Sequence, residues 1–208
     1  MTNQFDTTQL LALAAALGWA SGLRLYLVLT IVGLSGYTGW VDLPAGLRLL
    51  QHPLVLGASS LMLFIEFFAD KIPGLDTLWD LVHTVIRIPA GALLAAAVFG
   101  VDDAVMTLVA ALLGGTLAAT AHIAKATTRA AVNTSPEPFS NIGVSLLEDG
   151  LVPLALWFAH QHPFAFLAAL GVTLVLMLVA IAMLSKFLVG LWRRLRGGPP
   201  VPLPAAKG

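Results

Sequence analysis

Long apolar stretches alternate with short polar ones along the whole chain. Six of them lie at about residues 8–34, 53–70, 77–100, 103–128, 141–159 and 163–192. A transmembrane helix needs about 20 predominantly apolar residues to cross the hydrocarbon layer of a bilayer. The pattern therefore predicts an all-α fold, an integral membrane helical bundle of about six transmembrane helices.

The third stretch is the least regular. Its purely apolar part, residues 90–100, is too short to cross about 30 Å of hydrocarbon at about 1.5 Å per residue. A span here must include the polar residues before Pro89, and proline inside a helix removes a backbone hydrogen bond. We therefore expect the third helix to be kinked or broken.

Composition supports a membrane protein. Hydrophobic residues make up 58% of the chain and charged residues 11%, against about 45–50% and about 25% in soluble domains. The net charge of +0 gives no electrostatic argument for nucleic acid as a partner, and the absence of cysteine excludes disulfides and thiolate metal sites. We expect one transmembrane domain over residues 1–196 and a disordered Pro/Gly-rich tail over 197–208.

Basic residues near the helix ends suggest an orientation. Trp192-Arg193-Arg194-Leu195-Arg196 directly follows the last apolar stretch, and such clusters are retained in the cytoplasm. Six crossings then place both termini on the cytoplasmic side, with Lys71, Lys125 and Arg129. The prediction is a multi-pass protein of the bacterial inner membrane whose first partner is the lipid bilayer.

Several charged residues fall inside the apolar stretches. Arg24 lies near the middle of the first, where insertion of a charge costs about 2.5–3.5 kcal/mol, so it must face protein or water. Glu66 and Asp70 share one face of the second stretch with Ser59. Either Arg24 and Glu66 form a structural pair, or these residues contact an ion or a ligand.

A polar stripe opens the third stretch. Asp76, Asp80, His83 and Arg87 recur at i, i+4, i+7 and i+11, which places them on one helix face. Three interpretations stay open: a helix lying on the membrane surface, a water-lined seam, or a divalent metal site formed by Asp76, Asp80 and His83. No other cofactor is expected.

Basic residues gather at the end of the fourth stretch. His122, Lys125, Arg129 and Asn133 share one helix sector, and we expect it to face the acidic stripe of the second and third stretches. In the fifth stretch Asn141, Ser145 and Glu148 share a face, from which Asp149 is expected to point away. The turn residues 133–141 predict a structured loop.

Two patterns concern packing and repeats. Gly18 and Gly22, and likewise Ala111, Gly115 and Ala119, have small-xxx-small spacing, which permits close helix contact within the chain or in a homo-oligomer.

Six spans divide into three plus three, the plan of many transporters, or into two hairpins with polar, proline-containing turns.

One long segment resembles a known family. It runs from Glu66-Phe-Phe-Ala-Asp70-Lys71-Ile-Pro-Gly through Asp76-Thr-Leu-Trp79-Asp80 and His83 to Arg87-Ile-Pro89-Ala-Gly91, and Asn133-Thr-Ser-Pro-Glu-Pro-Phe-Ser-Asn141 follows downstream. These residues resemble a bacterial membrane family, domain-of-unknown-function family 4126, from Leu10 to about Leu195. The resemblance implies a multi-span inner-membrane protein and no particular activity.

A second, weaker similarity is local. Glu66-x-x-x-Asp70-Lys71 is similar to the Glu-x-Gly-Asp-Lys motif of a family of cation/proton exchangers. Here Phe68-Ala69 replaces the glycine, the carboxylates lie one residue further apart, and no second copy is present near Glu148. We treat it as an analogy.

These observations favour a small transporter or channel-like permease, coupled to protons or cations, for an unidentified solute or ion. The expected pathway residues are Arg24, Glu66, Asp70, Asp80, His83, Arg87, Lys125, Arg129 and Glu148. One alternative is a membrane-embedded, metal-dependent enzyme acting on lipid or polyprenyl-phosphate head groups. The other is a scaffold without catalytic activity, in which every charge is paired structurally.

Overall fold

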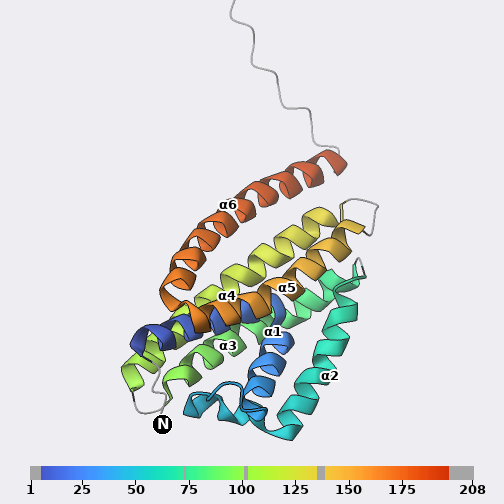
Figure 1. Cartoon of the computed structure of the whole chain (residues 1–208). Coiled ribbons are helices and arrows are strands. Elements are labelled where there is room, and N and C mark those ends of the chain that lie inside the picture. The colour runs from blue at the N-terminus through green and yellow to red at the C-terminus, as the bar shows by residue number, and fades with distance from the viewer. Residues whose placement is uncertain (1–5, 73, 101–102, 135–138, 197–208) are drawn as a thin grey trace, which may run out of the picture.

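The computed structural model describes residues 6–72, 74–100, 103–134 and 139–196 (Figure 1). These residues form seven helices and no strand, so the all-α prediction is confirmed. The helices are α1 (Thr7–Tyr37), the 3₁₀ helix η1 (Ala45–Gln51), α2 (Pro53–Ala69), α3 (Leu75–Phe99), α4 (Ala104–Val132), α5 (Phe139–Gln161) and α6 (Pro163–Leu195). The expected loop at residues 133–141 falls partly, and the tail after 196 entirely, outside the described residues.

Five helices are long and apolar enough to cross a membrane, namely α1, α3, α4, α5 and α6. The 17-residue α2 qualifies only together with η1, from which it is bent by 70°. Large apolar side chains such as Leu93, Leu112 and Val175 are exposed on the outside of the bundle, as is typical of a surface that contacts lipid. By length and composition the described chain has five candidate spans, or six if η1 and α2 count as one, which suggests a membrane-embedded protein. The division into two repeats stays a prediction.

Local sequence explains where the helices begin and end. Asp6 and Gln9 form a reciprocal capping box at the start of α1. Pro53 occupies the first turn of α2, where a missing N–H costs nothing. Gly74 and Gly100 flank α3 with φ of 86° and 68°, a conformation that favours glycine. The short turns hold the helix ends, and their polar residues, close together.

The discontinuity lies in α1, not in α3. Helix α3 continues through Pro89, whose side chain is exposed on the outer face and so leaves the buried face intact. The prediction of a broken third helix is therefore wrong. Instead Arg24 in α1 has non-helical backbone angles, φ −144° and ψ 79°.

Helix α1 turns back at Arg24 (Figure 1). Its first half runs parallel to α4, because Gly18 lies against Gly114 and Gly22 against Ala118. Its second half returns, because Gly33 lies against Leu50 of η1, and η1 itself packs on the end of α3. Both ends of α1 therefore lie at the η1 end of the bundle, and Arg24 lies at the inner tip. We call α1 re-entrant in this sense, that it enters the bundle and returns to the end from which it came.

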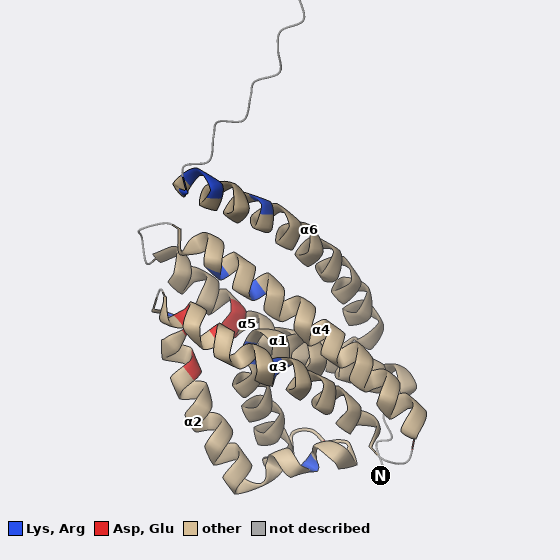
Figure 2. Ribbon diagram, turned by 180° about the vertical axis from the view of Figure 1, so that it is seen from behind, with Lys and Arg blue, Asp and Glu red and all other residues tan. Residues whose placement is uncertain are grey.

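The start of α1 and the end of α6 consequently lie at opposite ends of the bundle (Figures 1 and 2). The start of α1 is at the η1 end, whereas the end of α6 is at the other end, with the turn between α2 and α3. The side of the membrane on which each terminus lies stays a prediction.

Small residues allow α1 to occupy the centre of the bundle. Every residue from Ala16 to Leu25 is buried, and a Cβ on Gly22 would lie 2.2 Å from the Ala118 carbonyl oxygen. Gly18 and Gly22 thus pack inside the chain, and Gly115 lies against Ala92 of α3. A homo-oligomer through these faces stays a prediction. In contrast, α6 buries only Phe166 and Leu170.

Candidate functional site

A connected network of ten charged side chains fills the interior next to the tip of α1. Figure 2 shows acidic and basic residues gathered toward the α2–α3 end of the bundle. The cations are Arg24, Lys71, Arg87, Lys125 and Arg129, and the carboxylates are Glu66, Asp70, Asp80, Glu148 and Asp149. All except Lys71 and Asp149 have side chains no more than 6% exposed. Equal numbers of opposite charges make this burial tolerable.

Asp70 is the centre of the network. It caps the end of α2, and its Oδ2 lies 3.0 Å from Arg24 Nη1, 2.6 Å from Lys125 Nζ and 3.8 Å from Arg129 Nη2. One carboxylate oxygen therefore joins the tip of α1, the end of α2 and two turns of α4.

Arg87 forms a second centre on α3. Its Nη2 lies 2.7 Å from Glu66 Oε1, and its Nη1 lies 2.7 Å from Asp80 Oδ1. Lys125 Nζ also approaches Asp80, at 3.4 Å. The predicted meeting of the basic face of α4 with acidic residues of the second and third stretches is thus confirmed for Asp70 and Asp80.

Helix α5 closes the network. Arg129 donates from Nη1 to the backbone oxygen of Asn141 at 3.0 Å and to its side-chain oxygen, and from Nη2 to Glu148 Oε2 at 3.0 Å. The prediction that Asp149 points away is wrong, because its two oxygens lie 2.8 Å from Arg24 Nη2 and 3.1 Å from Lys71 Nζ. Glu148 and Asp149 both reach Arg24 on α1, while Glu148 also contacts α4 and Asp149 the turn after α2, so both are engaged.

The pairing of Arg24 also differs from expectation. Its guanidinium contacts Asp70, Asp149 and the Ser145 hydroxyl, whereas its contact with Glu66 is a 3.5 Å hydrogen bond to the backbone oxygen. The Glu66 carboxylate pairs with Arg87 instead, because Glu66 lies one turn before Asp70 and faces α3.

Lys71 is the network cation that the sequence pattern did not single out as a site residue. It lies in the turn between α2 and α3, and its side chain is 17% exposed. Burial lowers the pKa of its ammonium, while hydrogen bonding to Asp149 opposes that effect. No spacing pattern within one helix could reveal it, since its partner lies on α5.

Asp76 and His83 are buried on the same stripe but take no part in the ion pairs. Asp76 accepts hydrogen bonds from the Gly74 and Thr77 N–H groups and from the Asn133 amide. His83 stacks on Trp79, with ring centroids 4.0 Å apart, and its Nε2 lies 3.2 Å from the Tyr26 hydroxyl.

The stripe does not assemble the three predicted metal ligands. Asp76 binds backbone N–H groups, Asp80 binds Arg87, and His83 is held by aromatic side chains. Within the described part of the chain no group of three His, Asp or Glu residues is placed to hold a metal ion. A surface-lying helix is also disfavoured, because the polar face of α3 is buried.

Three carboxylates use only one oxygen. Glu66 Oε2, Asp70 Oδ1 and Asp80 Oδ2 are buried and have no hydrogen-bond partner among the described residues. Leaving a buried polar atom without a partner costs about 1–3 kcal/mol. These oxygens can therefore accept a proton or a further hydrogen bond.

Comparison with known proteins assigns the chain to a family. A model of the domain of unknown function DUF4126 matches residues 11–183. The chain belongs to the DUF4126 family. The match includes all ten network residues of this DUF4126 protein and extends from α1 into α6. No curated protein and no solved structure matches the chain.

Proposed function

We propose that this DUF4126 protein is a small membrane permease in which the network around Arg24 transfers a proton or a cation. The observation that carries the proposal is the re-entrant α1, whose tip lies inside ten paired charges. Backbone that leaves the helical conformation at membrane depth is tolerated where protein buries it or where it borders a water-filled cavity. Secondary transporters place their ion sites at such interrupted helices.

A side chain of α4 stabilises the backbone where α1 is interrupted. Lys125 donates from Nζ to the Leu23 carbonyl oxygen at 3.1 Å, which satisfies an acceptor next to the break. The same ammonium contacts Asp70 and Asp80. A change of charge on either carboxylate would therefore act directly on the backbone at the tip of α1.

Stability alone does not account for so many buried charges. Replacing a buried ion pair by well-packed apolar residues is often neutral or stabilising. Ionisable residues inside a membrane domain are costly, and function is the default explanation for them. This argument favours the permease over the scaffold, and the separate environments of Asp76, Asp80 and His83 favour it over the metal-dependent enzyme.

Glu66 is the best placed proton carrier. Its ion pair within the described residues is with Arg87 alone, whereas Asp70 contacts three cations. Protonating Glu66 leaves Arg87 paired with Asp80, so no cation loses its last partner. The free oxygen Oε2 offers the position for the proton.

The experiment is charge movement in proteoliposomes on a solid-supported membrane after jumps in pH, cation or anion concentration. We expect a current that depends on one of these ions and disappears in Glu66→Gln. Asp42→Asn is the matched control, because it also converts a carboxylate to an amide but lies outside the network. A Glu66→Gln variant that transports as well as the parent would overturn the role of Glu66.

A further inference from the structure

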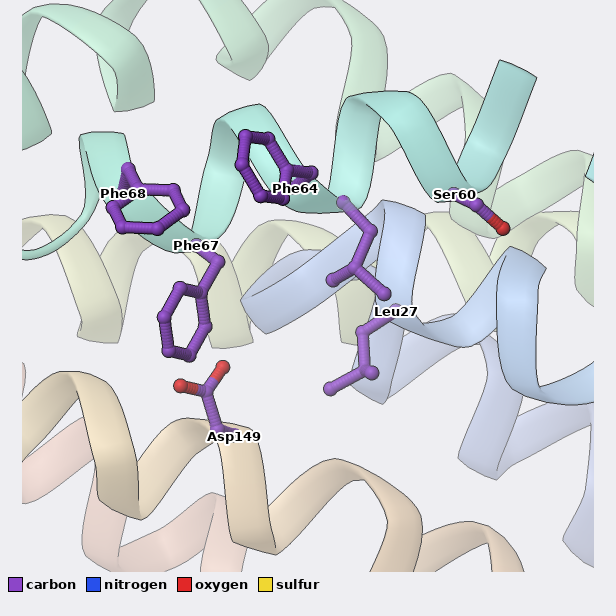
Figure 3. A pocket seen from close by; sticks show the side chains of 7 residues that line it. Leu27, Ser60, Phe64, Phe67, Phe68 and Asp149 are labelled. Carbon is purple, nitrogen blue, oxygen red and sulfur yellow. The ribbon is translucent and has the colours of Figure 1, made fainter. Parts of the chain in front are cut away.

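A groove on the outside of the bundle leads to the exposed edge of the network (Figure 3). It has a volume of about 480 Å³, which lies in the range of small-molecule sites. Its lining residues come from α1, α2 and α5: Leu27, Ser60, Leu63, Phe64, Phe67, Phe68 and Asp149. The walls are thus apolar and largely aromatic.

The groove is open toward the membrane. Helix α2 packs on α1, η1 and α3, and its backbone does not closely approach that of α5 in the described structure. Phe64 and Phe68 are 63% and 51% exposed. A molecule dissolved in the bilayer can therefore enter sideways between α2 and α5.

Two lining residues at the polar end of the groove, Phe67 and Asp149, also contact a cation that lies beside the groove. Figure 3 shows the Asp149 carboxylate facing the ring of Phe67. The Lys71 ammonium lies 3.2 Å from the centroid of that ring and 3.1 Å from Asp149 Oδ2. An aromatic face and a carboxylate together form a site that attracts positive charge, more strongly where water is excluded.

Lys71 is attached to this site by a flexible side chain, and its ammonium also donates to the Phe67 backbone oxygen and to the Ser145 hydroxyl, both at 3.2 Å. It lies in a turn, is partly exposed, and its lowered pKa reflects a cost of burying its charge. If its ammonium moves to solvent, Asp149 keeps the contact with Arg24 at 2.8 Å. A cation that carries its own apolar groups avoids much of the desolvation cost of an ammonium.

We propose that the groove binds lipophilic monovalent cations, such as quaternary ammonium or phosphonium ions with aryl or alkyl substituents, in place of the Lys71 ammonium. The charged centre lies between Phe67 and Asp149, and the substituents contact Leu63, Phe64 and Phe68. The identification of these cations as transported substrates rests on the proposed permease function. Their binding does not.

Equilibrium binding of tetraphenylphosphonium to the purified full chain in detergent tests the proposal. We expect Asp149→Asn and Phe67→Leu to weaken binding, the former at least about tenfold, equivalent to about 1.4 kcal/mol. Lys71→Gln is expected to strengthen binding, because it removes the competing cation. Phe164→Leu on the exposed surface of α6 is the matched control and should have no effect.

The affinity for tetraphenylphosphonium should fall in Asp149→Asn and rise in Lys71→Gln. A rise cannot be explained by misfolding, because a misfolded variant does not gain affinity. Weaker binding by Lys71→Gln would overturn the proposal. Equal binding of uncharged triphenylphosphine oxide, or displacement of the probe by a zwitterionic phospholipid, would also overturn it and identify a general apolar or lipid site.

Binding and transport fail separately. If the parent protein binds tetraphenylphosphonium but moves no ion, the proposed binding site is supported and the proposed permease function is overturned. If it moves an ion but does not bind tetraphenylphosphonium, the binding site is overturned and the permease function is supported.

Discussion

Arg24 Nη1 lies 3.0 Å from Asp70 Oδ2, and both side chains are completely buried. This contact joins the tip of the re-entrant α1 to the residue that caps the C-terminus of α2. Lys125 and Arg129 then connect the same oxygen to α4. The bend of α1 and the charge network therefore depend on one another, because neither could be buried alone.

We predict that Arg24→Met lowers the free energy of unfolding by about 3–5 kcal/mol, because it leaves buried carboxylates with fewer cations. The double variant Arg24→Met/Asp149→Asn should lose less than the sum of the two single changes. Equilibrium unfolding in mixed micelles measures all three values. Combining Arg24→Met with Asp42→Asn is the control, for which the effects should add; additive effects for the Asp149 pair would contradict the prediction.

Arg129 is predicted to require a guanidinium. It donates to Asn141, to Glu148 and to the Asp70 backbone oxygen at 2.9 Å, which the single ammonium of lysine cannot reach together. Arg129→Lys should therefore speed amide hydrogen exchange in the first turns of α5, measured by mass spectrometry. The control Arg193→Lys, on the exposed end of α6, should leave hydrogen exchange in α5 unchanged. Equal protection of α5 in the Arg129→Lys and Arg193→Lys variants would contradict the prediction that Arg129 holds the start of α5.

Much of this architecture follows from hydrophobic periodicity. The common helix face of Asp76, Asp80, His83 and Arg87 was predictable from their spacing, whereas its burial inside the bundle, and not at the membrane surface, was one of three open interpretations. The meeting of Lys125 with Asp70 and Asp80 followed from the cost of unpaired buried charges.

The pairing between distant helices was not predictable in the same way. Hydropathy gives α1 as one span, and the turn at Arg24 depends on carboxylates from α2 and α5 that only the assembled bundle brings together. Asp149 was misplaced for the same reason, because its partner Lys71 lies in a turn whose position no periodicity describes.

Close packing of α1 on α4 gives a further prediction. A Cβ on Gly22 would lie 2.2 Å from the Ala118 carbonyl oxygen, so Gly22→Ala should force the helices apart. Overpacking of this kind costs about 1–3 kcal/mol. Gly57→Ala is the matched control: a Cβ at Gly57 meets nothing within 4 Å, and removing a mid-helix glycine should stabilise α2 by about 0.5–1 kcal/mol. Unfolding in mixed micelles measures both, and equal stability of the two variants would contradict the packing argument.

The re-entrant α1 predicts that the ends of the chain lie on opposite sides of the membrane. The chain contains no cysteine, so single-cysteine variants need no other substitution. Thr7→Cys and Gln161→Cys lie at the η1 end, and Arg196→Cys lies at the α2–α3 end. In oriented vesicles, a membrane-impermeant maleimide should label the first two from one side and Arg196→Cys from the other.

Basic residues indicate which side is which. Lys71, Arg193, Arg194 and Arg196 all lie at the α2–α3 end, so this end should face the cytoplasm. Gln161→Cys and Arg196→Cys calibrate the two sides, because α6 separates them. Labelling of Thr7→Cys together with Arg196→Cys would mean that α1 crosses the membrane, and the bend at Arg24 would then lose its place in the permease mechanism.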